Sequence, residues 1–378
     1  MTPVELSRTV LHAVRRAVDE GELAVAVPER VVIAPPGPGG CGDYATNVAL
    51  QLARPAGQPP RRVAEILRPY LLRSGGITDV VVTGPGFINI SLRSGAPAAL
   101  VHEVLRRGPG YGHSDALAGQ VVRLHAPREV RAVVHLDVLS RLLRSQGAHV
   151  RAGCEGSPAA EWSSVLGVVL RDDGHDGPGD RVDVRDGVGI RGDIDVRDGV
   201  GVRGHVDVRD RVDVRPVPAP ADPLPLGRDA ARWALLHPAP HDRPRISDAH
   251  LVQRESNPLF RVRYAHARTR ALLRNAVDLG FTPEPGPEAA GDAQPLLQAL
   301  ADHPRILAGA AAHRAPDRLA RQLVTVADAV LPLLPAVLPL GEEKPSAAHR
   351  ARLALAAAAG TVLAGGLSLL GIDAPDHL

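Results

Sequence analysis

The fold of the second half of the chain is decided by one stretch of sequence, Asn257-Pro258-Leu259-Phe260-Arg261-Val262-Arg263-Tyr264-Ala265-His266-Ala267-Arg268. It opens a segment with helical spacing that extends over residues 260–279, and Gly280 follows as a C-cap. Further helices are predicted around it, at residues 228–236, 293–301, 304–312, 316–331 and 347–370. Residues 227–378 are therefore predicted to form an all-α helix bundle.

Arginines crowd this central predicted helix: Arg254, Arg261, Arg263, Arg268, Arg270 and Arg274. At about 100° per residue, Arg254, Arg261 and Arg268 share one stripe, and the other three share nearly the opposite stripe. Two opposite stripes cannot both face one RNA, so at least one is structural. Two alternatives stay open, a solvated helix with salt bridges to its neighbours and a phosphate-binding face of arginine forks.

The composition limits the class of protein. A chain of 378 residues can bury the cores of two or three domains, and its formal net charge of +2 does not by itself indicate nucleic-acid binding. Aromatic residues make up 2% of the chain, too few for the stacking platforms of single-strand binders. A helical protein that recognises RNA by shape and phosphates tolerates that scarcity.

The cysteines and histidines predict neither disulfides nor a metal site. Cys41 and Cys154 fit a reducing compartment. His125, His135 and His149 precede Cys154 at spacings that match no standard metal pattern. No apolar run reaches the roughly 18 residues that a membrane span needs. We therefore expect a cytoplasmic protein with no cofactor, no metal and no membrane segment.

The first half of the chain predicts two α/β units. Residues 1–95 predict a small α/β domain, with helices at 4–24 and 60–72 and strands at 77–82 and 87–92. Residues 119–171 predict a truncated Rossmann-like α/β remnant of a nucleotide-binding type of sheet, with a strand at 121–124, a helix at 134–145 and a further strand at 165–170.

A repeat separates these units from the helix bundle. The run from Asp183 to Gly189 recurs from Asp195 to Gly201, a period of 12, and a degenerate copy starts at Asp207. Its charges largely cancel, so residues 172–226 predict a disordered repeat linker. The alternative of a calcium-binding β-roll needs a Gly-Gly-x-Gly-x-Asp nonapeptide, which this period does not match. The predicted fold class is thus an α+β multidomain protein.

The quoted stretch resembles the signature that opens the anticodon-binding helical domain of arginyl-tRNA synthetases, Asn-Pro-Val-Tyr-Tyr-Val-Gln-Tyr-Ala-His-Ala-Arg. It departs at Arg261 and Arg263, where that family usually has an aromatic residue and a glutamine, and both changes make the helix more basic. Three other runs are similar to the same enzymes, the first two to their amino-terminal tRNA-contacting domain: Asp43-Tyr44-Ala45-Thr46-Asn47, Gly84-Pro85-Gly86-Phe87-Ile88-Asn89-Ile90 and Leu370-Gly371-Ile372-Asp373-Ala374-Pro375-Asp376-His377-Leu378.

This resemblance implies tRNA or a tRNA-like RNA as the partner. Because the amino-terminal domain of the family grips the outer corner of tRNA, Phe87 is expected to stack on a base and Asn89 to read a base edge. The alternative is that Phe87 packs in the core and Asn89 caps a turn. In the helical domain the resemblance implies that phosphates or anticodon bases are contacted by Arg261, Arg263, Tyr264, His266, Arg268, Arg270 and Arg274.

The two motifs with which class I synthetases stabilise charge on ATP phosphates have no counterpart where they are expected. Similarity of residues 137–143 to the family's Asp-Ala-Leu-Ala-Arg-Leu-Leu places the His-x-Gly-His motif near Ala126-Pro127-Arg128-Glu129. That run has neither histidine nor glycine. The Lys-Met-Ser-Lys motif should precede Asp229, but residues 216–227 contain no lysine, and Lys344 is the only lysine of the chain. We therefore predict no independent aminoacylation.

Four hypotheses follow. The first is a non-catalytic arginyl-tRNA synthetase-like protein that binds tRNA through its two flanking domains. The second is a protein-interaction or regulatory subunit that docks on a true synthetase or another protein. The third is an arginine–tRNA ligase with ATP binding, as the family would imply. The fourth is a decaying gene product. The oligomeric state stays open.

Overall fold

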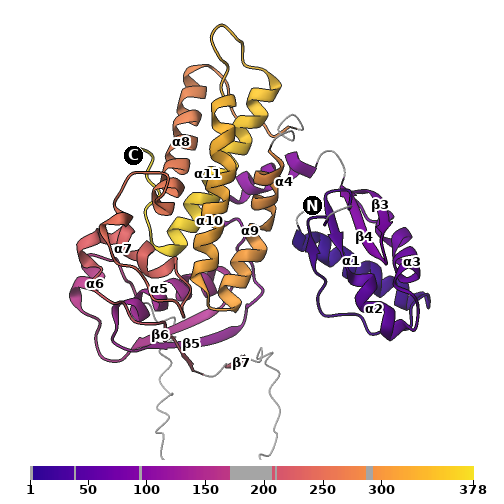
Figure 1. The fold of residues 1–378 in the computed structure, drawn as a ribbon, viewed down its shortest axis with the longest axis horizontal. Helices are drawn as coiled ribbons and strands as arrows, with labels where there is room; N and C mark the ends of the chain where they lie inside the picture. The colour runs from indigo at the N-terminus through magenta and orange to yellow at the C-terminus, as the bar shows by residue number, and fades with distance from the viewer. Residues whose placement is uncertain (1–2, 38–39, 93–95, 171–206, 209–210, 287–292) are drawn as a thin grey trace, which may run out of the picture.

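The computed structural model describes residues 3–37, 40–92, 96–170, 207–208, 211–286 and 293–378 (Figure 1). The predicted linker at residues 172–206 lies outside the described residues. The described parts form an amino-terminal α/β domain, a parallel sheet and a helix bundle, which confirms the predicted mixture of α and β architecture.

The amino-terminal domain is an antiparallel sheet packed with three helices. Its elements are α1 (Pro3–Asp19), β1 (Ile33–Ala34), β2 (Tyr44–Thr46), α2 (Val48–Ala56), α3 (Pro60–Leu72), β3 (Ile77–Thr83) and β4 (Phe87–Leu92), with strand order β1-β2-β4-β3. Helix α3 has Pro60 at its first position and buries Val63 and Leu67 on one stripe. The β3–β4 hairpin turns through Gly84 and Gly86, both at positive φ.

The chain leaves this domain along the helix bundle. Helix α4 (Ala96–Arg107) packs against α11 (Ala347–Leu370), and the short turn η1 (Gly108–Gly110) follows it. Tyr111 then donates a hydrogen bond from its hydroxyl to the carbonyl of Leu300, 3.1 Å away, and stacks on the His303 ring at 5.9 Å. The connection between the domains is therefore built into the bundle core.

The middle of the chain is a small parallel sheet. Its elements are β5 (Gln120–Ala126), α5 (Val130–Ser145), β6 (His149–Cys154), α6 (Ala160–Ser164), β7 (Asp207–Val208) and β8 (Val212–Asp213). Strand β5 is central: β6 pairs with it on one side, and β7 and β8 pair with it on the other. The predicted β-α step is confirmed, and α5 crosses from β5 to β6.

Two predictions for this region are wrong. Residues 165–170 form no strand, because the chain after α6 packs Leu166 and Val168 into the core without joining the sheet. The predicted linker ends earlier than expected, since residues 211–226 are ordered: Val214 is buried and donates its amide to the His125 carbonyl at 2.7 Å. The Val-Asp-Val alternation has the period of a strand, and pairing with the open side of β5 makes it one.

The helix bundle follows the predicted pattern closely. Its elements are η2 (Leu224–Leu226), α7 (Gly227–Leu236), η3 (Asp248–His250), α8 (Pro258–Asp278), α9 (Gln294–Ala312), α10 (Pro316–Val330), η5 (Leu331–Ala336) and α11. Helix α9 joins two predicted helices, because Pro304 lies inside it without ending it. Figure 1 shows α8 to α11 as the long bundle, with the parallel sheet at one end.

Two helical segments of the described chain are long and apolar enough to cross a membrane, 316–336 and Ala347–Leu370. Helix α11 is also packed against α4, α8 and α10, and 78% of its most apolar window is buried inside the protein. A helix that is apolar all round and enclosed by other helices is the pattern of a core helix.

A buried ion pair ties the parallel sheet to the bundle. Arg232 of α7 donates to Asp137 of α5 at 2.6 Å, and both side chains are almost fully buried. The same guanidinium donates to the carbonyls of Leu370 at 2.7 Å and Leu166 at 3.0 Å. Gly371 ends α11 at a φ of 71° against this guanidinium, where a Cβ would clash.

Two buried histidines make stability depend on pH. Burial lowers the pKa of His135 to about 3 and that of His303 to about 4. Below about pH 6.5 these histidines bind protons in the unfolded chain but stay neutral in the folded chain. The free energy of unfolding is therefore highest near neutral pH and falls as the pH drops towards 4. We expect His303→Phe, which keeps a ring against Tyr111, to reduce this dependence by up to about one proton. Urea unfolding at pH 7, 6 and 5 measures it, and an unchanged slope would contradict the role of His303.

Candidate nucleic-acid interface

Helix α8 begins where the quoted stretch begins. Asn257 accepts a hydrogen bond from the Leu259 amide at 3.1 Å, and Pro258 occupies the first helical position. The carboxamide of Asn257 also donates to the carbonyls of His250 and Val252, each at 2.9 Å. The first residue of the motif is therefore structural, because it caps the helix and fixes the preceding loop.

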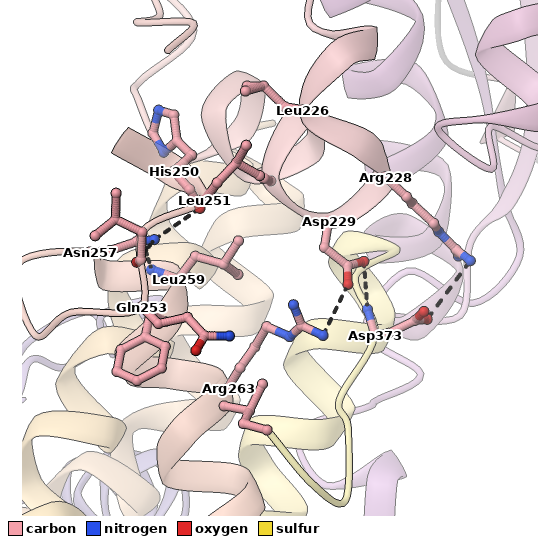
Figure 2. A pocket seen from close by; sticks show the side chains of 14 residues that line it. Leu226, Arg228, Asp229, His250, Leu251, Gln253, Asn257, Leu259, Arg263 and Asp373 are labelled. Atoms are coloured by element: carbon pink, nitrogen blue, oxygen red, sulfur yellow. Dashed lines mark hydrogen bonds and ion pairs between the residues drawn. The ribbon is translucent and has the colours of Figure 1, made fainter. Parts of the chain in front are cut away.

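A pocket of about 300 Å³ lies between the loop before α8, the start of α7 and the end of the chain (Figure 2). Figure 2 shows the Arg263 guanidinium pointing towards Asp229, with the ion pair at 3.4 Å. Asp229 also accepts the Asp373 amide at 3.1 Å, and Arg228 reaches the Asp373 carboxylate at 3.8 Å. The walls of the pocket are thus fixed by alternating charges, with Phe260 and exposed Leu251 and Leu378 at its edge.

One stripe of α8 faces outward. Phe260 stacks on Tyr264, with ring centroids 5.5 Å apart, and Tyr264 is exposed. Arg268 follows one turn later and is also exposed. Within the described residues, the guanidinium of Arg268 has no hydrogen-bond or ion-pair partner, and the same holds for the guanidinium of Arg254 before the helix. Stacked rings beside free guanidinium groups can hold a base and a phosphate together.

The other predicted arginines pair with groups of the same chain. Arg261 pairs with Asp328 of α10 at 3.3 Å, and Arg263 pairs with Asp229. Arg270 donates to the Asp376 carboxylate at 2.9 Å, a hydrogen bond that lowers the pKa of that carboxyl. Arg274 reaches the Asp376 carbonyl at 3.3 Å. Members of both stripes therefore fasten α8 to α7, α10 or the end of the chain.

His266 is turned into the protein. It is buried, and its Nδ1 lies 2.9 Å from the carbonyl of Pro375. Burial lowers the pKa of this imidazole, so it is neutral at physiological pH. Its position favours a role in docking the last residues of the chain onto α8.

The two predicted residues of the amino-terminal domain lie two positions apart in β4, on the same side of the strand, but they differ in exposure. Phe87 is exposed beside the hairpin turn, so its ring is available for stacking. Asn89 is buried: its carboxamide donates to Thr83 Oγ1 at 2.7 Å and to the Val81 carbonyl at 3.3 Å, and accepts the Cys41 amide at 3.4 Å. Asn89 therefore supports the turn, as the structural alternative expected, and has no free edge for a base.

Sequence reasoning missed the residues that occupy the carboxyl end of β5. There Glu129 caps α5: one carboxylate oxygen accepts the Ala132 amide at 2.8 Å and the other accepts the Ala219 amide at 3.1 Å. Arg131, two residues further in the first turn of α5, is fully buried and donates to the carbonyl oxygens of Val217, Leu235, Pro238, Ala239 and Asp242. A buried arginine without a carboxylate partner carries no sequence signature, so nothing in the sequence of α5, which holds other polar and charged residues, distinguishes Arg131.

The histidines and cysteine of the parallel sheet do not converge. Among the described residues, no group of three or more His, Cys, Asp or Glu could hold a metal ion. His135 lies inside the core against the Leu235 carbonyl, whereas His149 is exposed at the start of β6.

Two family models match the chain, one at each end. The arginyl tRNA synthetase N terminal domain matches residues 5–92, which covers α1 to β4. The DALR anticodon binding domain matches residues 262–378, which covers most of α8 and every element after it. The chain is an arginyl-tRNA synthetase-related protein. The resemblance of the quoted stretch is thereby confirmed.

Relatives align along the whole chain. The arginine–tRNA ligase of Paenarthrobacter aurescens is 27% identical over 550 residues, and that of Frankia alni is 28% identical over 553, each with 100% of both chains covered. The ligase of Micrococcus luteus is 35% identical over 195 residues, which cover 47% of this chain. An alignment of 550 positions against 378 residues leaves at least 172 positions where the relative has residues and this chain has none.

Solved arginyl-tRNA synthetases share the fold. The structure from Thermus thermophilus superposes with a TM-score of 0.64 at 16% identity and 100% coverage of both chains. That from Plasmodium falciparum superposes with a TM-score of 0.66 at 9% identity, over 100% of this chain and 99% of the other. The order of domains in the synthetase fold is thus kept in this chain.

Proposed function

We propose that this protein binds tRNA with its amino-terminal domain and its anticodon-binding helix bundle, and that it does not aminoacylate the tRNA by itself. Phe87 stacks on a base at one end. Tyr264, backed by Phe260, stacks on a base at the other, and Arg268 neutralises a phosphate. The support is the exposure of these side chains on two domains that match tRNA-contacting families.

The observation that carries the second half of this proposal is the start of α5. A helix amino terminus at the carboxyl end of a parallel strand is where nucleotide-binding sheets hold phosphate. Here the Glu129 carboxylate already accepts the amide of the first turn and bridges to Ala219. A second anion at this place would be repelled by that carboxylate, so these residues do not fit an ATP phosphate.

The comparisons favour a second candidate, an arginine–tRNA ligase. Each of the three ligases named above carries that name, and two of the three alignments run from end to end. For this chain to aminoacylate alone, the segment around Ala219 would have to move away from Glu129 at the carboxyl end of β5. Another cation would also have to replace the lysines of the Lys-Met-Ser-Lys motif. The two candidates differ in one measurable property, the activation of arginine by ATP.

The deciding experiment is arginine-dependent ATP–pyrophosphate exchange, run with and without tRNA, beside anisotropy titrations with tRNA-Arg and an unrelated tRNA. We expect binding to tRNA-Arg and no exchange above the blank. Repeated turnover of exchange or charging would replace the non-catalytic proposal by the ligase. Equal, weak binding of both tRNAs that disappears with salt would overturn the tRNA-binding proposal itself.

The outward stripe of α8 gives a prediction of its own. Tyr264→Ala should weaken tRNA binding by about 1–2 kcal/mol, because base–aromatic stacking contributes about 1–3 kcal/mol. Arg268→Ala should lower the salt slope of binding by about one, since one phosphate loses its cation. Titrations at several salt concentrations measure both effects.

The control for this prediction is Arg54→Ala, which removes an exposed arginine from α2 in the amino-terminal domain. It should leave affinity and slope unchanged. If the Arg54 and Arg268 variants behave alike, the outward stripe of α8 is not the contact surface.

A further inference from the structure

A second, larger cavity lies between the amino-terminal domain and the helix bundle. Its volume is about 820 Å³. One wall is α1 with residues 29–33, and the other is formed by α9 and α10. Ser7 of α1 donates to the Val31 carbonyl at 2.9 Å, which holds the first wall together. Figure 1 shows α1 on the side of its domain that faces the bundle. We call this cavity the interdomain groove.

The interdomain groove is lined by basic side chains from both domains. They are Arg8 and Arg30 on one wall, and Arg305, Arg318, Arg321 and His313 on the other, against the single acid Glu29 in the lining. Arg305 and Arg321 are held in place by Asp302 at 3.1 Å and Asp317 at 2.8 Å. In the described part of the chain, no acidic group pairs with Arg8, Arg30 or Arg318.

The free arginine of the second wall lies over the smallest residue of α9. A Cβ built on Gly309 would lie 3.7 Å from Nη1 of Arg318. The glycine therefore leaves the groove open beneath the guanidinium. Apolar side chains, among them Val32 and Ile306, line the rest of the groove. This combination can contact sugars by their apolar faces and phosphates by arginine forks.

We propose that the interdomain groove binds the sugar-phosphate backbone of the RNA between its two ends, as a third contact of the same tRNA. This inference rests on the proposed function. Its occupant must carry closely spaced negative charge, because three guanidinium groups from two domains are left without an acid. The basic side chains in the groove's lining are arginine and histidine, and the lining contains no Phe, Tyr or Trp, so we expect the groove to hold backbone rather than stacked bases. Binding there would also fix the two domains relative to each other.

The test is the salt dependence of tRNA-Arg binding by the full chain. The variant Arg8→Ala/Arg30→Ala/Arg318→Ala removes the three unpaired cations from the groove. The control Arg54→Ala/Arg123→Ala/Arg243→Ala removes three exposed arginines that lie outside it, so both variants have the same net charge. We expect the groove variant to lower the salt slope by about two to three and the control to leave it almost unchanged. Hydroxyl-radical footprinting should show lost protection between the RNA elbow and the anticodon loop.

A second variant tests the groove without touching a charge. Gly309→Leu puts bulk under Arg318 and is compatible with a helix interior, so the fold should persist. We expect it to weaken tRNA-Arg binding about tenfold or more at every salt concentration while leaving the salt slope within one unit. Loss of binding in the groove variant, with no loss in its charge-matched control, supports the groove proposal.

Three outcomes separate the groove from the proposed function. If the unmodified protein binds tRNA-Arg and the groove variant matches its control, the groove proposal is overturned and the proposed function stands. If Gly309→Leu binds as tightly as the unmodified protein, the groove proposal is also overturned. If the unmodified protein binds no tRNA, both proposals are overturned together.

Discussion

Asp137→Ala is expected to lower the free energy of unfolding by about 3–5 kcal/mol, because it leaves the Arg232 guanidinium buried without its counter-ion. Arg232 is inaccessible to solvent and donates to Asp137 at 2.6 Å. Its other hydrogen bonds go to carbonyls of Leu370 and Leu166, which belong to the end of α11 and to the segment after α6. One lost carboxylate therefore weakens the junction of three segments.

Guanidinium unfolding followed by tryptophan fluorescence measures this effect, since Trp233 is the buried neighbour of Arg232 in α7. Glu65→Ala is the control. Its carboxylate lies 3.7 Å from Arg61 at the surface, and exposed pairs contribute about 0–1 kcal/mol. A loss below about 1 kcal/mol for Asp137→Ala would show that the buried pair is not what joins α5 to α7.

A double variant separates charge from packing. Asp137→Leu with Arg232→Met removes both charges and keeps apolar volume, so it should recover much of the loss of the single variant. Recovery identifies the uncompensated charge as the cause. A double variant as unstable as Asp137→Ala would instead point to the hydrogen bonds that Arg232 gives to the carbonyls of Leu166 and Leu370.

The elements that depend on local sequence were predictable. The bounds of α11 are those expected, because Ser346 accepts the His349 amide at its start and Gly371 ends it with a positive φ. Helix α8 differs by two residues at its start and one at its end. The strand β8 was not predictable, since a two-residue strand exists only because β5 offers it a partner.

The candidate site also has features that the sequence predicts and features that it does not. The sequence predicts that the arginines of α8 form two stripes, and helix geometry alone is enough for that. Which arginines are free depends on acids far away in the chain: Asp229 holds Arg263, Asp328 holds Arg261 and Asp376 holds Arg270. No spacing rule connects these partners. The exposed aromatic stripe and the interdomain groove follow only from the folded arrangement.

Arg131→Met should destabilise the protein by about 3–5 kcal/mol. Methionine keeps most of the apolar volume but donates no hydrogen bond, so the carbonyls now bound by Arg131 lose their donor. Each unsatisfied buried carbonyl costs about 1–3 kcal/mol, and local movement or water recovers part of that. Arg128→Met is the matched control. Arg128 lies three residues away, is exposed and makes one bond, to the Ser157 carbonyl at 3.0 Å.

Hydrogen exchange shows which segment loosens at the carboxyl end of β5 when Arg131 is replaced. Arg131 holds residues 217–242 over the start of α5, where Ala219 donates to Glu129. In Arg131→Met the amides of Val217 and Ala219 should therefore exchange much faster, whereas the Arg128 variant should leave them protected. Unchanged protection of both amides in Arg131→Met would mean that the segment is held by its own packing.

Arg131→Lys distinguishes the geometry of the donor from its charge. A lysine ammonium keeps the positive charge but has three donors on one atom, whereas the guanidinium spreads its donors over a planar fork. We expect Lys at this position to rescue little of the lost stability, because Arg131 reaches the carbonyls of Leu235, Val217 and Ala239 from three different nitrogens, and a single ammonium cannot occupy all three places. Full rescue by Lys would show that the positive charge of residue 131, and not the geometry of its donors, stabilises the carboxyl end of β5. This place would then resemble an anion site, which would contradict the proposal that it does not fit an ATP phosphate.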